Sequence, residues 1–174
     1  ILLEVQILKR LEQLEAVNSI RNCLSRYMEI CDALDQNTNL NELMALFSQD
    51  AVWEGLGERY SKAFGRLQGA EAIAHMFQSY MQQEAHFSLN AHFINSEQIR
   101  VDGNNAVGTW LMLQSSSFSQ GGSHLTSAKL RIDFKQQIEG AWVISHFRTE
   151  NIFSREVSAW SDQMDLPVPA AAAN

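Results

Sequence analysis

The sequence predicts an α+β domain in which three N-terminal helices pack on a curved, cone-shaped antiparallel sheet. Apolar residues recur with a helical period in the first half of the chain, and the period changes to two from about residue 89 onward. The stretches DGNN, SQGGS and EGA separate the later apolar segments as turn signals. Helices followed by strands favour helices gathered on one face of a sheet, and the resulting cone can hold a small apolar ligand.

Three helices are expected, in order, before the long strands. The first runs from about residue 4 to residue 34, with a buried apolar stripe that includes Ile20, Leu24 and Tyr27. The second follows Asn39, which has the type and spacing of an N-cap with Glu42 three residues later, and it extends through LMALF. The segment GAEAIAHMFQSYMQQ repeats the helical pattern and predicts the third helix.

The second half of the chain predicts strands. A short hairpin, AVWEGL followed by SKAFGRLQG, is expected between the second and third helices. Four long strands are expected to form an antiparallel meander, at 89–101, 106–118, 124–136 and 142–152.

Length and charge limit the organisation and the partners. The 174 residues suit one domain, which we divide into a helical extension (1–15), a domain (16–155) and a C-terminal tail (156–174). The net charge is −7 and the Lys and Arg residues are scattered, so nucleic acid is not an expected partner. No run of about 18 apolar residues and no signal-peptide core occur, so we expect no membrane contact and a cytoplasmic location.

Cysteine and histidine spacing gives no sign of a metal site. Cys23 and Cys31 lie roughly 12 Å apart along one predicted helix, too far for a disulfide, and are expected to be small core residues. The five histidines show no His-x-x-x-His spacing, and no Cys-x-x-Cys occurs. We therefore expect no metal.

Five segments carry a resemblance to a known family: IRNCLSRYMEICDALD, LMALFSQDAVWEG, GRLQGAEAI, AHFINSEQIRVDGNNAVGTW and GAWVISHFRTE. In this order they resemble the SnoaL-like members of the nuclear transport factor 2-like superfamily, over about residues 16–152. The resemblance implies the cystatin-like cone fold and chemistry without a cofactor. It leaves the function open, because polyketide cyclases, ketosteroid isomerases, dehydratases, a dehydrochlorinase and noncatalytic subunits share this fold.

The resemblance also implies catalytic positions. Dehydratase members use a Tyr and an Asp on the first long helix with a His from the sheet. RYMEICD offers Tyr27 and Asp32 at these places, and AHFIN offers His92 close to the place of the sheet histidine. The dehydrochlorinase member has its Asp about a turn later, which points to Asp35 instead.

Helical geometry gives a different answer for the aspartate. With Ile20 taken as zero on an ideal helix, Asp35 falls at about 60°, inside the edge of the buried stripe, and Asp32 at about 120°, at its border. Family spacing favours Asp32 and periodicity favours Asp35. We prefer Asp32 slightly and keep both as candidates.

Other residues are candidates for ligand contact. Some dehydratases use an Arg on the last strand; its place here is near Asn151, and Arg148 lies three residues earlier. The cavity walls are expected to include these apolar residues, at least half of them as plain core: Trp53, Phe64, Phe93, Trp110, Met112 and Phe147.

The remaining histidines give alternatives to His92. His86 lies six residues earlier and could take part instead. His124 and His146 could approach the cavity or simply pack, whereas the helical period predicts that His75 faces solvent.

Two hypotheses for the function follow. The first is a cofactor-independent lyase or isomerase of the dehydratase, ketosteroid isomerase or polyketide cyclase type, acting on a small apolar ring compound. In it Asp32 or Asp35 orients His92 as the base, and Tyr27 donates to an oxygen. The second is a noncatalytic binding or structural subunit, such as a ring-hydroxylating dioxygenase β-subunit. In either case a homodimer or homotrimer is expected.

Overall fold

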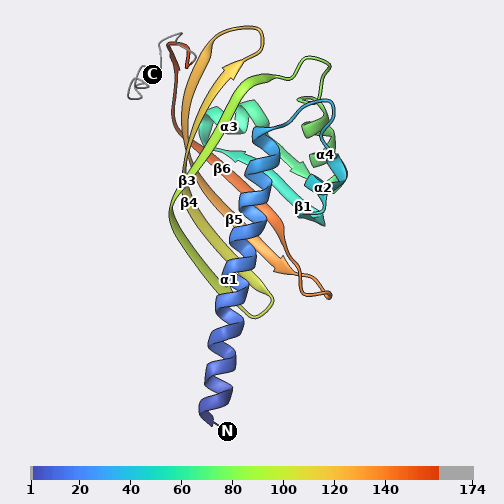
Figure 1. Ribbon diagram of the computed structural model, residues 1–174, viewed down its shortest axis with the longest axis vertical. Coiled ribbons are helices and arrows are strands. Elements are labelled where there is room, and N and C mark those ends of the chain that lie inside the picture. Colours follow the sequence, from blue (N-terminus) through green and yellow to red (C-terminus); the bar gives the residue numbers. More distant parts are fainter. Residues whose placement is uncertain (1, 161–174) are drawn as a thin grey trace, which may run out of the picture.

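Helices and strands follow one another along the chain much as the apolar periodicity predicts (Figure 1). The computed structural model describes residues 2–160. In this part of the chain the elements are α1 Leu2–Asp32, α2 Leu40–Met44, β1 Phe47–Leu56, α3 Gly57–Phe64, β2 Arg66–Gln68, α4 Ala70–Gln78, β3 Phe87–Asp102, β4 Asn105–Phe118, β5 Ser123–Gln136 and β6 Trp142–Val157.

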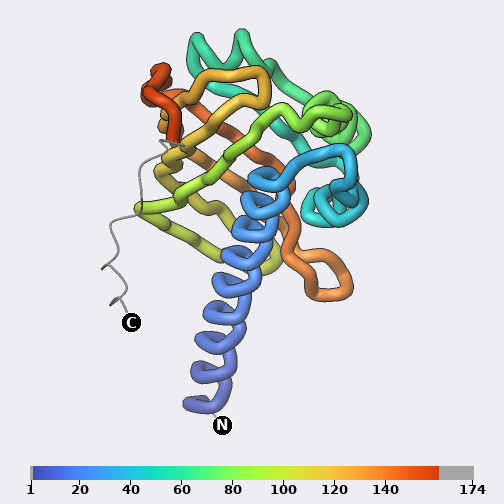
Figure 2. The backbone as a smooth tube through the Cα atoms, turned by 45° about the horizontal axis from the view of Figure 1, so that its top comes forward, coloured from blue at the N-terminus to red at the C-terminus, as the bar shows by residue number. Residues whose placement is uncertain are grey.

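The strands form one curved sheet in the order β2-β1-β6-β5-β4-β3. The four long strands β3 to β6 make the predicted antiparallel meander. β1, however, pairs with β6 in parallel, which corrects the expectation of a wholly antiparallel sheet. The long connection between these two strands permits the parallel pairing. Figures 1 and 2 show α1 crossing one face of the sheet, with α2 and α4 to one side of it.

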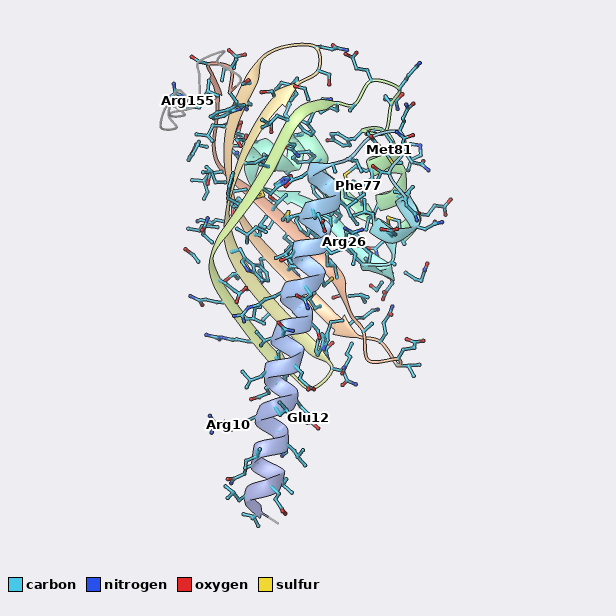
Figure 3. All side chains as sticks on the ribbon, in the orientation of Figure 1. Arg10, Glu12, Arg26, Phe77, Met81 and Arg155 are labelled. Atoms are coloured by element: carbon cyan, nitrogen blue, oxygen red, sulfur yellow. The ribbon has the colours of Figure 1, made fainter. Side chains whose placement is uncertain are left out.

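The first helix extends past one end of the sheet that it covers (Figure 1). Its buried stripe begins at Ala16 and continues through Ile20 and Tyr27, which pack against the sheet. The first turns of this helix project beyond the sheet, and Arg10 and Glu12 are exposed (Figures 1 and 3). The predicted extension at 1–15 is therefore continuous with the first helix of the domain.

Alternation along the strands builds the core beneath α1. On β5, Leu130, Ile132 and Phe134 are almost fully buried, whereas the residues between them are more exposed. This period of two places one face of β5 toward the helices and the other toward solvent. The concave face of the sheet thus supplies one wall of the space that the helices cover.

The predicted hairpin is replaced by a strand, a helix and a short strand. The segment GERYSKAF forms α3, so the predicted second strand is reduced to β2, which pairs antiparallel with β1. Tyr60 and Phe64 are four residues apart on α3 and therefore share one helical face, where their rings lie 5.0 Å apart. This face packs toward Trp53 of β1. That tertiary contact favours a helix over a strand in this segment. The second predicted helix was also too long, because Phe47 begins β1.

The C-terminal boundary also shifts. β6 ends at Val157, so the first two residues of the predicted tail belong to the sheet. The tail from residue 161 onward lies outside the described residues. No helix within residues 2–160 combines the length and the apolar character needed to cross a membrane.

Close packing of α3 on β1 gives a stability prediction. A Cβ atom added at Gly55 would lie 2.3 Å from the backbone oxygen of Tyr60, and a backbone atom has little room to move. Gly55→Ala should therefore lower the free energy of unfolding by about 1–3 kcal/mol, measured by urea denaturation. Ser61→Ala, on an exposed position of the same helix, should change it by less than about 0.5 kcal/mol. Equal effects of the two changes would contradict this packing argument.

Candidate active site

A cavity of about 310 Å³ lies between the helices and the concave face of the sheet. Its helical wall is largely apolar and includes Met28 of α1, Leu34 just after that helix, and Phe77 of α4, which is labelled in Figure 3. Tyr60 and Phe64 of α3 add to it. Pockets of this size, with apolar walls and a few convergent polar groups, are typical sites for small ligands.

Asp32 and His92 form a hydrogen-bonded pair at this cavity. His92 Nδ1 lies 2.5 Å from Asp32 Oδ1, and the backbone N–H of His92 donates to Asp32 Oδ2 at 3.1 Å. The His92 side chain is only 12% exposed. With Nδ1–H donating to the carboxylate, Nε2 carries the lone pair that can accept a proton.

Two features of the fold bring this pair together. Asp32 is the last residue of α1, and β3, which carries His92, is the edge strand of the sheet. At a sheet edge one side of the strand lacks a neighbouring strand, so Asp32 can accept the backbone N–H as well as the ring N–H of His92. Asn90 adds a second tie, since its Nδ2 donates to the Cys31 carbonyl at 3.4 Å.

Asp35 does not approach the histidine. It lies beyond the end of α1, where its carboxylate accepts the backbone N–H of Asn37 at 2.7 Å and contacts the Thr38 hydroxyl at 3.3 Å. The helical-wheel argument for Asp35 was wrong because α1 ends at Asp32, so the angle of 100° per residue does not apply to the next turn.

Tyr27 lies on the cavity wall and is 4% exposed. Its hydroxyl accepts a hydrogen bond from Trp53 Nε1 at 3.2 Å and also bonds to the Cys31 thiol. Burial raises the pKa of Tyr27 well above its usual value, with the Trp53 bond acting in the opposite direction. The hydroxyl is therefore neutral at neutral pH. A ligand oxygen could take over its proton from the thiol, which is a weak acceptor.

The same burial makes Cys31 unsuited to nucleophilic catalysis. Burial raises the pKa of the Cys31 thiol to about 12, although the bond from Tyr27 lowers it somewhat. The reactive form of a cysteine is the thiolate. Cys31 is therefore a protonated wall residue at neutral pH.

The expected cavity walls are correct in part. Trp53, Met112 and Phe147 line the cavity together with Phe64, and the Trp53 and Phe147 rings stack with centroids 5.4 Å apart.

Three other expected contact residues do not line the cavity. Phe93 is 53% exposed, because it follows His92 on β3 and so points to the opposite face. Trp110 is buried beside α1, and its indole N–H donates to Glu97 at 3.2 Å. Arg148 points to the outer face and pairs with Asp133 at 2.6 Å.

The sequence reasoning overlooked most of the polar sheet wall. Strand alternation through MLQSS could have revealed part of it, because Met112, Gln114 and Ser116 share the face that meets the cavity. The polar lining residues that were not expected are Asn90, Gln114, Ser116, Thr126, Thr149 and Ser154, with Tyr60 and Tyr80 from the helical side. His124, which was expected either to approach the cavity or to pack, lines it.

The other histidines have separate environments. His86 is exposed and contacts the Phe118 ring at 5.3 Å without lining the cavity, and His75 is exposed as expected. His146 lies on the outer face, where Nε2 contacts Glu54 at 2.6 Å and Nδ1 accepts from Arg148 at 2.9 Å. Burial opposes ionisation of Glu54, but Arg66 and His146 outweigh it and lower its pKa.

Comparison with known proteins places this fold. A model of the SnoaL-like domain matches residues 12–148. The chain belongs to the SnoaL-like family. Comparison with curated proteins gives no match.

Three solved structures with the same fold carry different functional descriptions. Hexachlorocyclohexane dehydrochlorinase LinA type 3 from Novosphingobium barchaimii has a TM-score of 0.68 and 14% identity, over 86% of this chain and 94% of that one. A protein assigned as a scytalone dehydratase from Novosphingobium aromaticivorans has a TM-score of 0.68 and 15% identity, over 85% of this chain and 91% of that one. A nuclear transport factor 2-like protein with a cystatin-like fold, from N. aromaticivorans, has a TM-score of 0.63 and 22% identity, over 84% of this chain and 88% of that one. These likenesses show the expected cystatin-like fold for the SnoaL-like protein.

No metal site is built into the described part of this SnoaL-like protein. Within residues 2–160, no three His, Cys, Asp or Glu side chains come close enough together to hold an ion. The titratable pair that the chain itself supplies at the cavity is Asp32–His92.

The two histidines that pair with carboxylates, His92 and His146, should differ in tautomer. His92 should carry its proton on Nδ1, because that atom faces the Asp32 carboxylate, whereas neutral His146 should carry it on Nε2, because Arg148 donates to its Nδ1. Long-range ¹H–¹⁵N spectra of the SnoaL-like protein at neutral pH distinguish the two forms. The same tautomer at both rings would contradict one of these hydrogen-bond assignments.

Proposed function

We propose that this SnoaL-like protein is a cofactor-independent lyase or isomerase that acts on a small, largely apolar ring compound. The observation that carries the proposal is the Asp32–His92 pair, in which a carboxylate 2.5 Å from Nδ1 leaves Nε2 as a base on the wall of an apolar cavity. Such a base is what the removal of a proton from carbon requires.

The proposed reaction begins with His92 Nε2, which takes a proton from a ring carbon. The electrons of the broken C–H bond form a double bond, while a leaving group departs or the proton returns at another carbon. Asp32 orients the ring and stabilises the imidazolium that forms, since it accepts the Nδ1–H. Tyr27 donates a hydrogen bond to the oxygen on which negative charge develops.

The walls of the cavity support this chemistry by limiting water. Aromatic and thioether side chains cover the helical side, with Phe77, Met28 and Phe64 among them. A dry, apolar surrounding strengthens the interaction of the donor with a developing charge. It also favours an apolar ring over a charged substrate.

Structural neighbours suggest suitable probe reactions. A dehydrochlorinase removes hydrogen chloride and a dehydratase removes water, and both names occur among proteins of this fold. Elimination requires a base beside a ring carbon, which is the role that we propose for His92. Hexachlorocyclohexane and scytalone are therefore the first two substrates to test.

The experiment measures chloride release from hexachlorocyclohexane, loss of water from scytalone, and deuterium uptake by cyclic ketones in D₂O. Turnover by the native protein and by His86→Gln, with strong loss in Asp32→Asn, would support the proposal. His86 is the control because it lies outside the cavity lining. Equal turnover in Asp32→Asn would contradict the role of the pair. Binding of the ring compounds without turnover or exchange would favour the noncatalytic subunit.

A further inference from the structure

A row of polar side chains crosses the cavity wall from the Asp32–His92 pair to the far strands. His92 of β3 is in register with Gln114 of β4, which is opposite Thr126 of β5, which is opposite Ser154 of β6. All four residues line the cavity. His124, two residues from Thr126 on β5, lines it as well.

The far end of this row is a compact hydrogen-bonded cluster. His124 Nδ1 lies 3.0 Å from Ser154 Oγ and 3.5 Å from Thr126 Oγ1, and the two hydroxyl oxygens are 3.0 Å apart. Nδ1 and both hydroxyls are thus engaged with one another. His124 Nε2 has no hydrogen-bond partner within residues 2–160.

The middle of the wall is bridged by hydrogen bonds between β3 and β4. Asn90 Oδ1 accepts hydrogen bonds from Gln114 Nε2 at 2.8 Å and from Ser116 Oγ at 2.9 Å, and Asn90 Nδ2 donates to the Cys31 carbonyl. The ring nitrogens without a protein partner therefore lie at the two ends of the wall, as Nε2 of His92 and Nε2 of His124.

We infer that His124, Thr126 and Ser154 form a second polar subsite, which binds a hydroxyl group at the end of the ligand remote from His92. The inference rests on the proposed function in taking the cavity as the substrate site. A hydroxyl both donates and accepts, so it can bond to Nε2 in either tautomer of His124. The substrate class is then narrowed to ring compounds that carry an oxygen at each end and are apolar between them.

The charge near the cluster favours a neutral group. Glu156 is directly opposite His124 in the β5–β6 register, and such cross-strand neighbours share a face of the sheet. Its carboxylate would repel an anion. Arg155, labelled in Figure 3, alternates with Ser154 along β6 and so points to the other face.

Strand spacing sets the length of the ligand. β3 and β5 are two strand steps apart, and β3 and β6 are three, which corresponds to roughly 10 and 14 Å along the sheet. The concave curvature shortens the path across the cavity. Two or three fused rings with terminal oxygens match this span.

The test compares two neutral probes, 2-naphthol and 2,6-dihydroxynaphthalene, which differ only in the second, distal hydroxyl. Dissociation constants are measured by naphthol fluorescence and checked by calorimetry. The native protein should bind the dihydroxy probe about three- to tenfold more tightly, as expected for one additional hydrogen bond. His124→Phe should abolish this preference, because the distal hydroxyl then loses its partner at Nε2.

His86→Phe is the matched control. Both histidine rings contact Phe118, with centroids 5.3 Å away for His86 and 6.3 Å for His124, so a general disturbance of Phe118 would appear in both variants. If His124→Phe does not fold, the double change Thr126→Val with Ser154→Ala tests the same cluster and should also reduce the preference. No preference in the native protein, or an unchanged preference in the variants of the cluster, would overturn the inference.

The outcome is separate from that of the proposed function. His92→Gln should weaken both probes alike and keep the preference for the distal hydroxyl. A preference that depends on His124, without any turnover, would support the subsite and oppose the lyase or isomerase proposal. Turnover that depends on His92, without any preference for the dihydroxy probe, would support the lyase or isomerase proposal and oppose the subsite.

Discussion

Replacing His92 with Gln should lower the turnover number about 10²- to 10⁴-fold, because the amide cannot accept the proton that Nε2 of the imidazole takes. His92 is held by Asp32 through two hydrogen bonds, so its ring has one orientation toward the cavity. Turnover is measured on whichever of the two elimination substrates reacts, with the melting temperature as a check on folding.

His146→Gln is the control for this change. His146 is also a partly buried histidine paired with a carboxylate, but it lies on the outer face of the sheet beside Glu54. We expect its replacement to leave turnover within about twofold of the native value, since His146 does not line the cavity. Equal losses in the two variants would indicate unfolding rather than loss of a base.

Replacing Tyr27 with Phe should lower turnover of an oxygen-bearing substrate, scytalone or a cyclic ketone, about 10²- to 10³-fold, as for the removal of one donor to a developing oxyanion. The ring would still pack against Phe147 at 5.1 Å and Phe47 at 5.7 Å, so the wall should keep its shape. The loss should appear in kcat more than in KM, because the donor acts mainly on the charge that forms in the transition state.

Trp53→Phe tests how the acidity of the Tyr27 hydroxyl affects turnover while the hydroxyl itself is kept. The Trp53 indole donates to the Tyr27 hydroxyl at 3.2 Å and so lowers the pKa of Tyr27 against the larger effect of burial. Without this bond the pKa of Tyr27 rises further and the hydroxyl becomes a weaker donor. We expect a loss smaller than that of Tyr27→Phe; a KM effect alone in both variants would show that Tyr27 only binds.

Much of the fold follows from local patterns. The four long strands were predicted within a few residues, since the period of two and the glycine-containing turns specify them directly. The helix at Gly57–Phe64 was missed because its eight residues are too few for a clear period, and its stability comes from packing Tyr60 and Phe64 near Trp53. Likewise, no local signal indicates that β1 joins β6 in parallel.

The candidate site was predicted at its centre and along part of its apolar wall. The resemblance gave Tyr27, Asp32 and His92, and these three residues lie on or beside the cavity. It did not give His124 and Ser154, which are 30 residues apart in the chain and meet only because β5 and β6 pair in one register. A one-residue shift in that register would turn Ser154 to the other face.

The sequence by itself determined the α+β order of the elements, the strand faces and the chemical types available to a base and a donor. These depend on neighbouring residues, through periodicity and turn chemistry. The tertiary structure alone decided which aspartate meets His92, that Trp110 packs beside α1 and not at the cavity, and how far the polar row extends. The physical reason is that these contacts depend on where α1 ends and how the strands align. Both are set by the sum of many weak packing interactions between residues far apart in the chain.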